Sequence, residues 1–137
     1  MISLADYIGP WGNSPDWTSA RQANAEKLLA AVNVLMGLAE SDGVRFPTNV
    51  LTHSQISGAK YGGFRPQDCP QGAPHSNHKE GLAVDLFDPN GEIDAYCMAH
   101  LDKLELCGIW IEAPDSTPHW SHWSCVPPHS GNRVFIP

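Results

Sequence analysis

The segment from Ser76 to Asp85 constrains this chain more than any other, because its ten residues read Ser-x-His-x-x-Gly-x-Ala-x-Asp. His78 and Asp85 are seven positions apart, which is enough for a loop histidine, a turn and the start of a strand. Gly81 lets the backbone turn or approach a neighbour closely, and Ala83 leaves room beside a bound ion. The segment therefore predicts that one imidazole and one carboxylate face the same point.

A second histidine-bearing segment follows roughly 35 residues later and contains His122 between Trp120 and Trp123. We expect His122 to come from a neighbouring strand, with the two tryptophans shaping and drying the pocket. Two imidazoles and one carboxylate are the ligands of a catalytic zinc site in which water takes the fourth position. The sequence thus predicts Zn²⁺ held by His78, Asp85 and His122, and a hydrolase that uses it.

The composition narrows the class of protein. The chain has 137 residues, 42% hydrophobic and 17% charged, which predicts a single globular domain over residues 1–137. Its net charge of -7 argues against nucleic acid or an anionic membrane surface as partner. No signal peptide and no apolar run of ~20 residues is visible, so we expect a cytoplasmic protein. We also expect a monomer. The four cysteines form no Cys-x-x-Cys pair, and we expect free thiols.

The first half of the chain is dominated by one expected helix. Apolar residues recur at three- and four-residue spacing over 17–40, which predicts an amphipathic helix ending near Asp42 and Gly43. Ser14 followed by Pro15 is the expected N-cap. The Leu and Met stripe of this helix is interpreted as core.

The second half of the chain is expected to contain both helix and strands. A loop over 66–77 is too long for a small domain unless it walls a site. The expected later helix runs from Glu92 to Leu106 and ends at Gly108. Expected strands are Val50–Thr52, Ala83–Phe87, Ile109–Glu112, Trp120–Cys125 and Arg133–Ile136. The predicted fold class is α+β, with a small antiparallel sheet and flanking helices.

Three blocks together resemble a known family. Gly62–Arg65, Ser76–Asp85 and Trp120–His122 are similar to motifs of the zinc peptidases that include D-Ala-D-Ala carboxypeptidases, vancomycin-resistance D-Ala-D-Ala dipeptidases and phage L-Ala-D-Glu endopeptidases. The blocks span nearly half of the chain, and the middle one is highly specific. The resemblance implies the scaffold shared by hedgehog domains and D-Ala-D-Ala peptidases.

The resemblance also implies roles for individual residues. It implies His78, Asp85 and His122 as zinc ligands, Ser76 as a hydroxyl beside the ligands or the substrate, and Arg65 as a clamp for a substrate carboxylate or carbonyl. A structural ion pair with a nearby acid is the alternative for Arg65. Trp120 is expected to contact substrate.

One position departs from the family pattern. The family usually carries Asp or Glu three residues before its last histidine, as the general base, and this chain has His119 there. A neutral imidazole accepts a proton near neutral pH, so His119 is the predicted base. It is alternatively a fourth metal ligand, or neither. Glu112 and Asp115 lie on the approach to this segment and are candidates to replace it spatially.

These expectations lead to two hypotheses. The first is a zinc metallopeptidase of phage-lysin type that hydrolyses the stem peptides of bacterial peptidoglycan. The second is a catalytically weak or inert metal-binding domain that serves recognition or forms part of a virion, and the missing acid at position 119 is its chief support. The metal content and its ligand shell distinguish an open catalytic site from a closed structural one.

Overall fold

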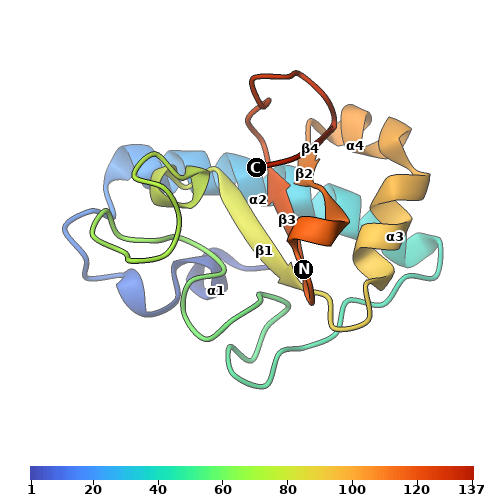
Figure 1. Ribbon diagram of the computed structural model, residues 1–137. Coiled ribbons are helices and arrows are strands. Elements are labelled where there is room, and N and C mark those ends of the chain that lie inside the picture. The colour runs from blue at the N-terminus through green and yellow to red at the C-terminus, as the bar shows by residue number, and fades with distance from the viewer.

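The computed structural model describes all 137 residues as an α+β fold with a four-stranded sheet, in which α2 lies behind the sheet and α3 and α4 lie to one side (Figure 1). The helices are α1 (Leu4–Ile8), α2 (Ser19–Ser41), α3 (Glu92–Ala99) and α4 (Leu101–Cys107). The strands are β1 (Ala83–Phe87), β2 (Trp110–Glu112), β3 (Trp120–Ser124) and β4 (Val134–Phe135). Three short 3₁₀ helices complete the chain: η1 (Gly9–Trp11), η2 (Asn77–Glu80) and η3 (Pro114–Ser116).

The long helix α2 runs behind the sheet and forms the main wall of the core (Figure 1). Its apolar stripe is buried as the spacing predicted. Against it pack the inward side chains of the sheet, among them Val84 and Leu86 of β1, Ile111 of β2 and Trp123 of β3. Because side chains alternate along a strand, Asp85 and His122 point to the opposite face of the sheet. The core therefore occupies one face of the sheet and leaves the other for the candidate site.

The sheet is mixed, with the strand order β1-β3-β2-β4. β1 and β2 both pair with β3 in antiparallel register, but β4 pairs with β2 in parallel. The prediction of a purely antiparallel sheet is thus wrong in its last strand. After β3 the chain passes through a proline-containing loop and returns to the outer edge of β2, where Ile111 N donates to Arg133 O at 3.0 Å. That return sets the direction of β4.

Two local predictions in the first half are wrong. Thr18, and not Ser14, caps α2, since its hydroxyl accepts from Arg21 N; Ser14 instead accepts from Asp16 N in the preceding turn. Val50–Thr52 is a turn, closed by a bridge between Asn49 and Ser54. The outer edge of β1 is instead covered by irregular chain, through hydrogen bonds that involve residues 55, 57 and 62.

The predicted second helix divides into α3 and α4 at His100, whose backbone leaves the helical region at φ −133° and ψ 50°. The loop over 66–77 contains no helix or strand until η2 begins, as predicted. All four cysteines are free, which confirms the prediction. No helix has the length and apolar character needed to cross a membrane.

Candidate metal centre

His78 is held by a short helix that its neighbours fix at both ends. The hydroxyl of Ser76 accepts a hydrogen bond from His78 N at 3.3 Å and caps η2. Gly81 ends η2 at φ +77°, and a Cβ at this position would lie 2.7 Å from Arg21 O of α2. Only glycine fits such an approach without strain. The glycine that the motif places here is therefore needed both for the turn and for the packing of η2 against α2.

The imidazole of His78 is oriented by a backbone carbonyl. Its Nδ1 lies 2.9 Å from Gly63 O, and because a carbonyl only accepts, Nδ1 carries the proton. This tautomer leaves a lone pair on Nε2, which faces the centre of the cluster. Burial lowers the pKa of His78, although the neighbouring Asp85 carboxylate raises it in part. Nε2 is accordingly the unprotonated nitrogen of a neutral imidazole, which suits it to bind a metal.

Asp85 and His122 are direct cross-strand partners in the β1–β3 ladder. Their side chains lie on the same face of the sheet, with Asp85 Oδ1 2.8 Å from His122 Nδ1. Burial alone would raise the pKa of Asp85, but His78 and His122 outweigh it and hold the pKa well below its usual range. The carboxylate is therefore ionised and available as a ligand.

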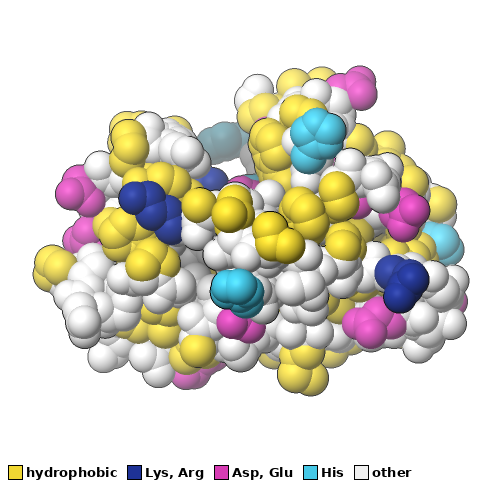
Figure 2. All heavy atoms as spheres, turned by 90° about the horizontal axis from the view of Figure 1, so that it is seen from below, with side chains coloured by type: hydrophobic (Ala, Val, Ile, Leu, Met, Phe, Trp, Pro, Cys, Tyr) yellow, Lys and Arg dark blue, Asp and Glu magenta, His cyan; other side chains and the backbone are white.

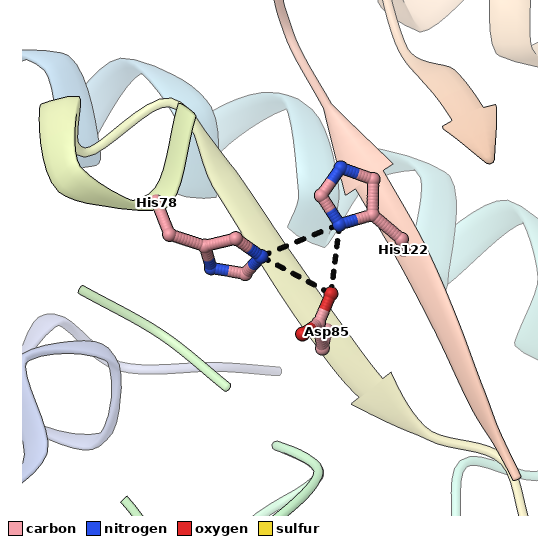
Figure 3. A group of neighbouring side chains, drawn as sticks. All are labelled: His78, Asp85 and His122. Carbon is pink, nitrogen blue, oxygen red and sulfur yellow. Dashed lines mark hydrogen bonds and ion pairs between the residues drawn. The ribbon is translucent and has the colours of Figure 1, made fainter. Parts of the chain in front are cut away.

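Three donor atoms from three elements converge on one point (Figure 3). His78 Nε2 lies 3.2 Å from Asp85 Oδ1 and 3.3 Å from His122 Nδ1. A tetrahedral ion bonded at about 2.1 Å to two such donors separates them by about 3.4 Å. The structure thus brings the three predicted ligands together in an arrangement that could hold a metal ion.

Arg65 stands beside the cluster and binds its carboxylate. Nη2 donates to Asp85 Oδ2 at 3.1 Å, and Nε donates to Tyr61 O at 2.7 Å. The ion pair considered in the sequence is therefore present. It also fixes the carboxylate so that Oδ1 is the atom facing the two imidazoles. Nη1 makes no hydrogen bond within the protein and remains free for another group.

His119 lies away from the three ligands. It precedes β3 with a left-handed backbone at φ +74°, its side chain is exposed, and Nδ1 lies 3.3 Å from Pro89 O. It does not line the cavities that adjoin the cluster. Of the site residues predicted from the sequence, His119 is the one that the fold does not bring to the cluster.

Glu112 occupies the cluster side of the sheet instead. The β2–β3 register pairs Ile111 with Trp123, and its continuation sets Glu112 opposite His122. Glu112 lines the same cavity as the three ligands, and its carboxylate makes no hydrogen bond within the protein. Burial raises the pKa of Glu112, and His122 offsets part of that rise. Asp115, the other acid considered from the sequence, lies exposed in η3.

Two cavities meet at the cluster. The first measures about 440 Å³ and contains all three ligands, Glu112 and Ser76. The second measures about 470 Å³ and contains Lys60. Arg65, Asp85 and Trp120 line both, so the predicted substrate-contacting residues do face open space. Figure 2 shows a notch in the molecular surface, with charged and histidine atoms in or beside it.

Comparison of the chain with protein-family models, curated proteins and solved structures gave no match.

Proposed function

We propose that this protein is a zinc-dependent peptidase that hydrolyses D-amino-acid-containing peptide bonds of bacterial peptidoglycan. The observation that carries the proposal is the convergence of two imidazole nitrogens and one carboxylate oxygen in an open cavity that also holds an unpaired carboxylate. The three-ligand set is typical of catalytic zinc sites, which keep one position for water or substrate. The class of substrate rests on the resemblance of the three sequence blocks.

The chain's own residues provide a site that fits zinc. His78, oriented by Gly63 O, and the cross-strand pair Asp85 and His122 supply the ligands. When bound, zinc would polarise the scissile carbonyl and lower the pKa of the attacking water. Arg65 holds Asp85 in the orientation that presents Oδ1, and partners of this kind affect metal affinity strongly.

Glu112 is the general base in this mechanism. A base works best when its pKa lies near the working pH, and burial moves the pKa of Glu112 upward in that direction. Its position across the ladder from His122 places the carboxylate beside the ligands. Glu112 thus takes the proton from the attacking water and passes it to the leaving amine.

The remaining predicted residues orient the substrate. Arg65 Nη1, which has no partner within the protein, donates to the carbonyl of the scissile bond or its neighbour. Trp120 lines both cavities and excludes water from the bound peptide. Ser76 acts mainly by capping η2 and so positions His78.

Zinc content and peptide hydrolysis test the proposal together. Purified protein is expected to bind one zinc per chain and to release new amino groups from peptidoglycan fragments. His122→Ala should lose both zinc and activity. If protein with one bound zinc leaves peptidoglycan fragments and D-Ala-D-Ala peptides intact, the enzyme proposal fails and the inert metal-binding domain is favoured.

Substitution of the two candidate bases tests the assignment of Glu112. Glu112→Gln is expected to lower kcat by about 10²- to 10⁴-fold with zinc still bound. His119→Gln should remain close to wild type, because His119 lies outside the cavities. Asp115→Asn removes a nearby exposed carboxylate and serves as the matched control. A loss of activity in His119→Gln but not in Glu112→Gln would reverse the assignment.

A further inference from the structure

The second cavity at the cluster, which Glu112 does not line, has no assigned role. It measures about 470 Å³, and of the three ligands only Asp85 lines it. It shares Arg65 and Trp120 with the cavity that holds Glu112. A peptide crossing the metal centre would therefore extend into this second cavity on one side of the bond to be cut.

The charges that line the second cavity are unequal. Asp85 is its one acidic residue, and the guanidinium of Arg65 pairs with it at 3.1 Å. The remaining cation is Lys60, which forms no ion pair with any carboxylate of the chain. The first cavity, in contrast, holds the unpaired carboxylate of Glu112. An anionic group of a bound peptide is consequently favoured in the second cavity.

Lys60 is placed by two aromatic residues. Trp11 Nε1 donates to Lys60 O at 2.9 Å, which fixes the backbone. The rings of Trp11 and Tyr61 stack with centroids 5.8 Å apart, and the ammonium of Lys60 lies 5.2 Å from the Tyr61 centroid. Aromatic faces attract an ammonium without neutralising its charge. The cation is thus held against these two rings and makes no hydrogen bond within the protein, and Lys60 lines both the second cavity and a neighbouring cavity of about 230 Å³ that contains Asp6.

Cations are sparse in this protein, with 8 Lys and Arg against 15 Asp and Glu. Figure 2 shows few Lys or Arg atoms on the face that it draws. Lys60 therefore places a positive charge beside the ligands on a protein that is otherwise acidic. This charge would attract a substrate carboxylate.

We propose that Lys60 is a specificity residue that binds a carboxylate of the peptide substrate in the second cavity. This inference rests on the proposed function and refines the substrate class to peptides with a free carboxylate close to the scissile bond. Two sources of that group fit. One is the C-terminal carboxylate of a D-Ala-D-Ala peptide, and the other is the α-carboxylate of a D-Glu residue linked through its side chain.

Two matched pairs of peptides separate these sources. Each pair contains the same peptide with the relevant carboxylate free or converted to a carboxamide: D-Ala-D-Ala with its C-terminus changed, and L-Ala-γ-D-Glu with its α-carboxylate changed. With zinc-loaded wild type, one pair is expected to show a 5- to 20-fold higher kcat/KM for the free acid, mainly through KM, roughly as for a single charge-assisted hydrogen bond. The pair that shows this preference identifies the source.

Variants at Lys60 assign the preference to this residue. Lys60→Met should abolish it and Lys60→Arg should retain most of it, while Lys27→Met, an exposed lysine on α2, should match wild type. Equal cleavage of acid and amide by wild type overturns the inference. So does a preference that survives in Lys60→Met, because Arg65 would then be the anion-binding group.

Binding measurements keep the inference testable if nothing is cleaved. The same four peptides are titrated into the zinc-loaded protein, with tryptophan fluorescence as the readout. A binding preference for the free acid that disappears in Lys60→Met supports Lys60 and leaves the failure with the peptidase proposal. Absence of any such preference overturns the role of Lys60 as well.

Discussion

Replacing Gly81 with alanine is expected to destabilise the fold and weaken the metal centre together. Gly81 has φ +77°, where a non-glycine residue costs about 1–2 kcal/mol. The new Cβ would lie 2.7 Å from Arg21 O, well inside ordinary contact, which begins near 3.4 Å. Because that oxygen belongs to the backbone of α2, the turn after η2 must move, and overpacking of this kind costs a further 1–3 kcal/mol, approximately. The expected loss in the free energy of unfolding is about 2–5 kcal/mol.

Gly108→Ala separates the two contributions. Gly108 ends α4 with a similar backbone, φ +68°, but a Cβ there meets no atom within 4 Å. This control should lose only the backbone term of about 1–2 kcal/mol. Equilibrium urea unfolding of both variants in the presence of a chelator gives the losses without a contribution from metal. The difference between the two variants measures the close approach of η2 to α2.

The metal affinity of the two variants completes the test. His78 lies three residues before Gly81 on η2, so movement of this turn should shift Nε2 relative to Asp85 and His122. We expect zinc affinity, measured by chelator competition, to fall by about 10-fold or more in Gly81→Ala. Gly108→Ala should bind zinc as wild type does. Equal unfolding free energies for the two variants, or unchanged zinc affinity in Gly81→Ala, would refute the argument.

Three further outcomes are expected. Arg65→Lys should weaken zinc binding by about 10-fold in chelator competition, because an ammonium cannot donate to both Asp85 Oδ2 and Tyr61 O as the guanidinium does. Unchanged zinc affinity with a lower kcat would mean that Arg65 acts on substrate alone. Asp94→Asn should raise the free energy of unfolding at pH 7, because burial raises the pKa of Asp94 and its Oδ1 has no hydrogen-bond partner. Because the pKa of Asp94 is raised in the folded state, the wild type loses stability as pH rises through that pKa. The difference in free energy of unfolding between variant and wild type, measured with urea, should therefore disappear below pH 3.8, the ordinary pKa. Removal of zinc by a chelator should lower Tm by roughly 10 °C relative to protein in free zinc at 100 times Kd, and a Tm that is insensitive to zinc would contradict metal binding by the folded state.

Local rules predicted the parts of the fold that depend on neighbours in sequence. The apolar spacing of α2 identified its buried stripe, and the motif from Ser76 to Asp85 identified a turn followed by a buried strand. In both cases the residues that determine the structure lie within the element itself. The prediction of Ser14 as the N-cap of α2 was wrong, because Ser14 and Thr18 are both suitable residues and only the packing of the preceding turn selects Thr18.

One error arose because a side chain just outside the predicted strand decides its conformation. Val50 and Leu51 have strand-like character, yet the Asn49 side chain accepts from Leu51 N and donates to Ile56 O and Gly58 O. These bonds fold the segment into a turn and leave both apolar side chains exposed. An asparagine at the start of a turn is a recognised signal, and here it outweighs strand propensity.

The candidate base shows most clearly why spacing along the chain is insufficient. Residues three apart on an extended strand point to opposite faces, so His119 could share a face with His122 only if the backbone departed from a strand. The left-handed conformation of His119 does depart from it, but its ring is directed to Pro89 O. Glu112 precedes His122 by ten positions and still lies opposite it across the ladder, on the face that carries the ligands. A carboxylate missing from one strand can therefore be supplied by the adjacent strand, which is why the histidine at position 119 is compatible with the proposed hydrolytic chemistry.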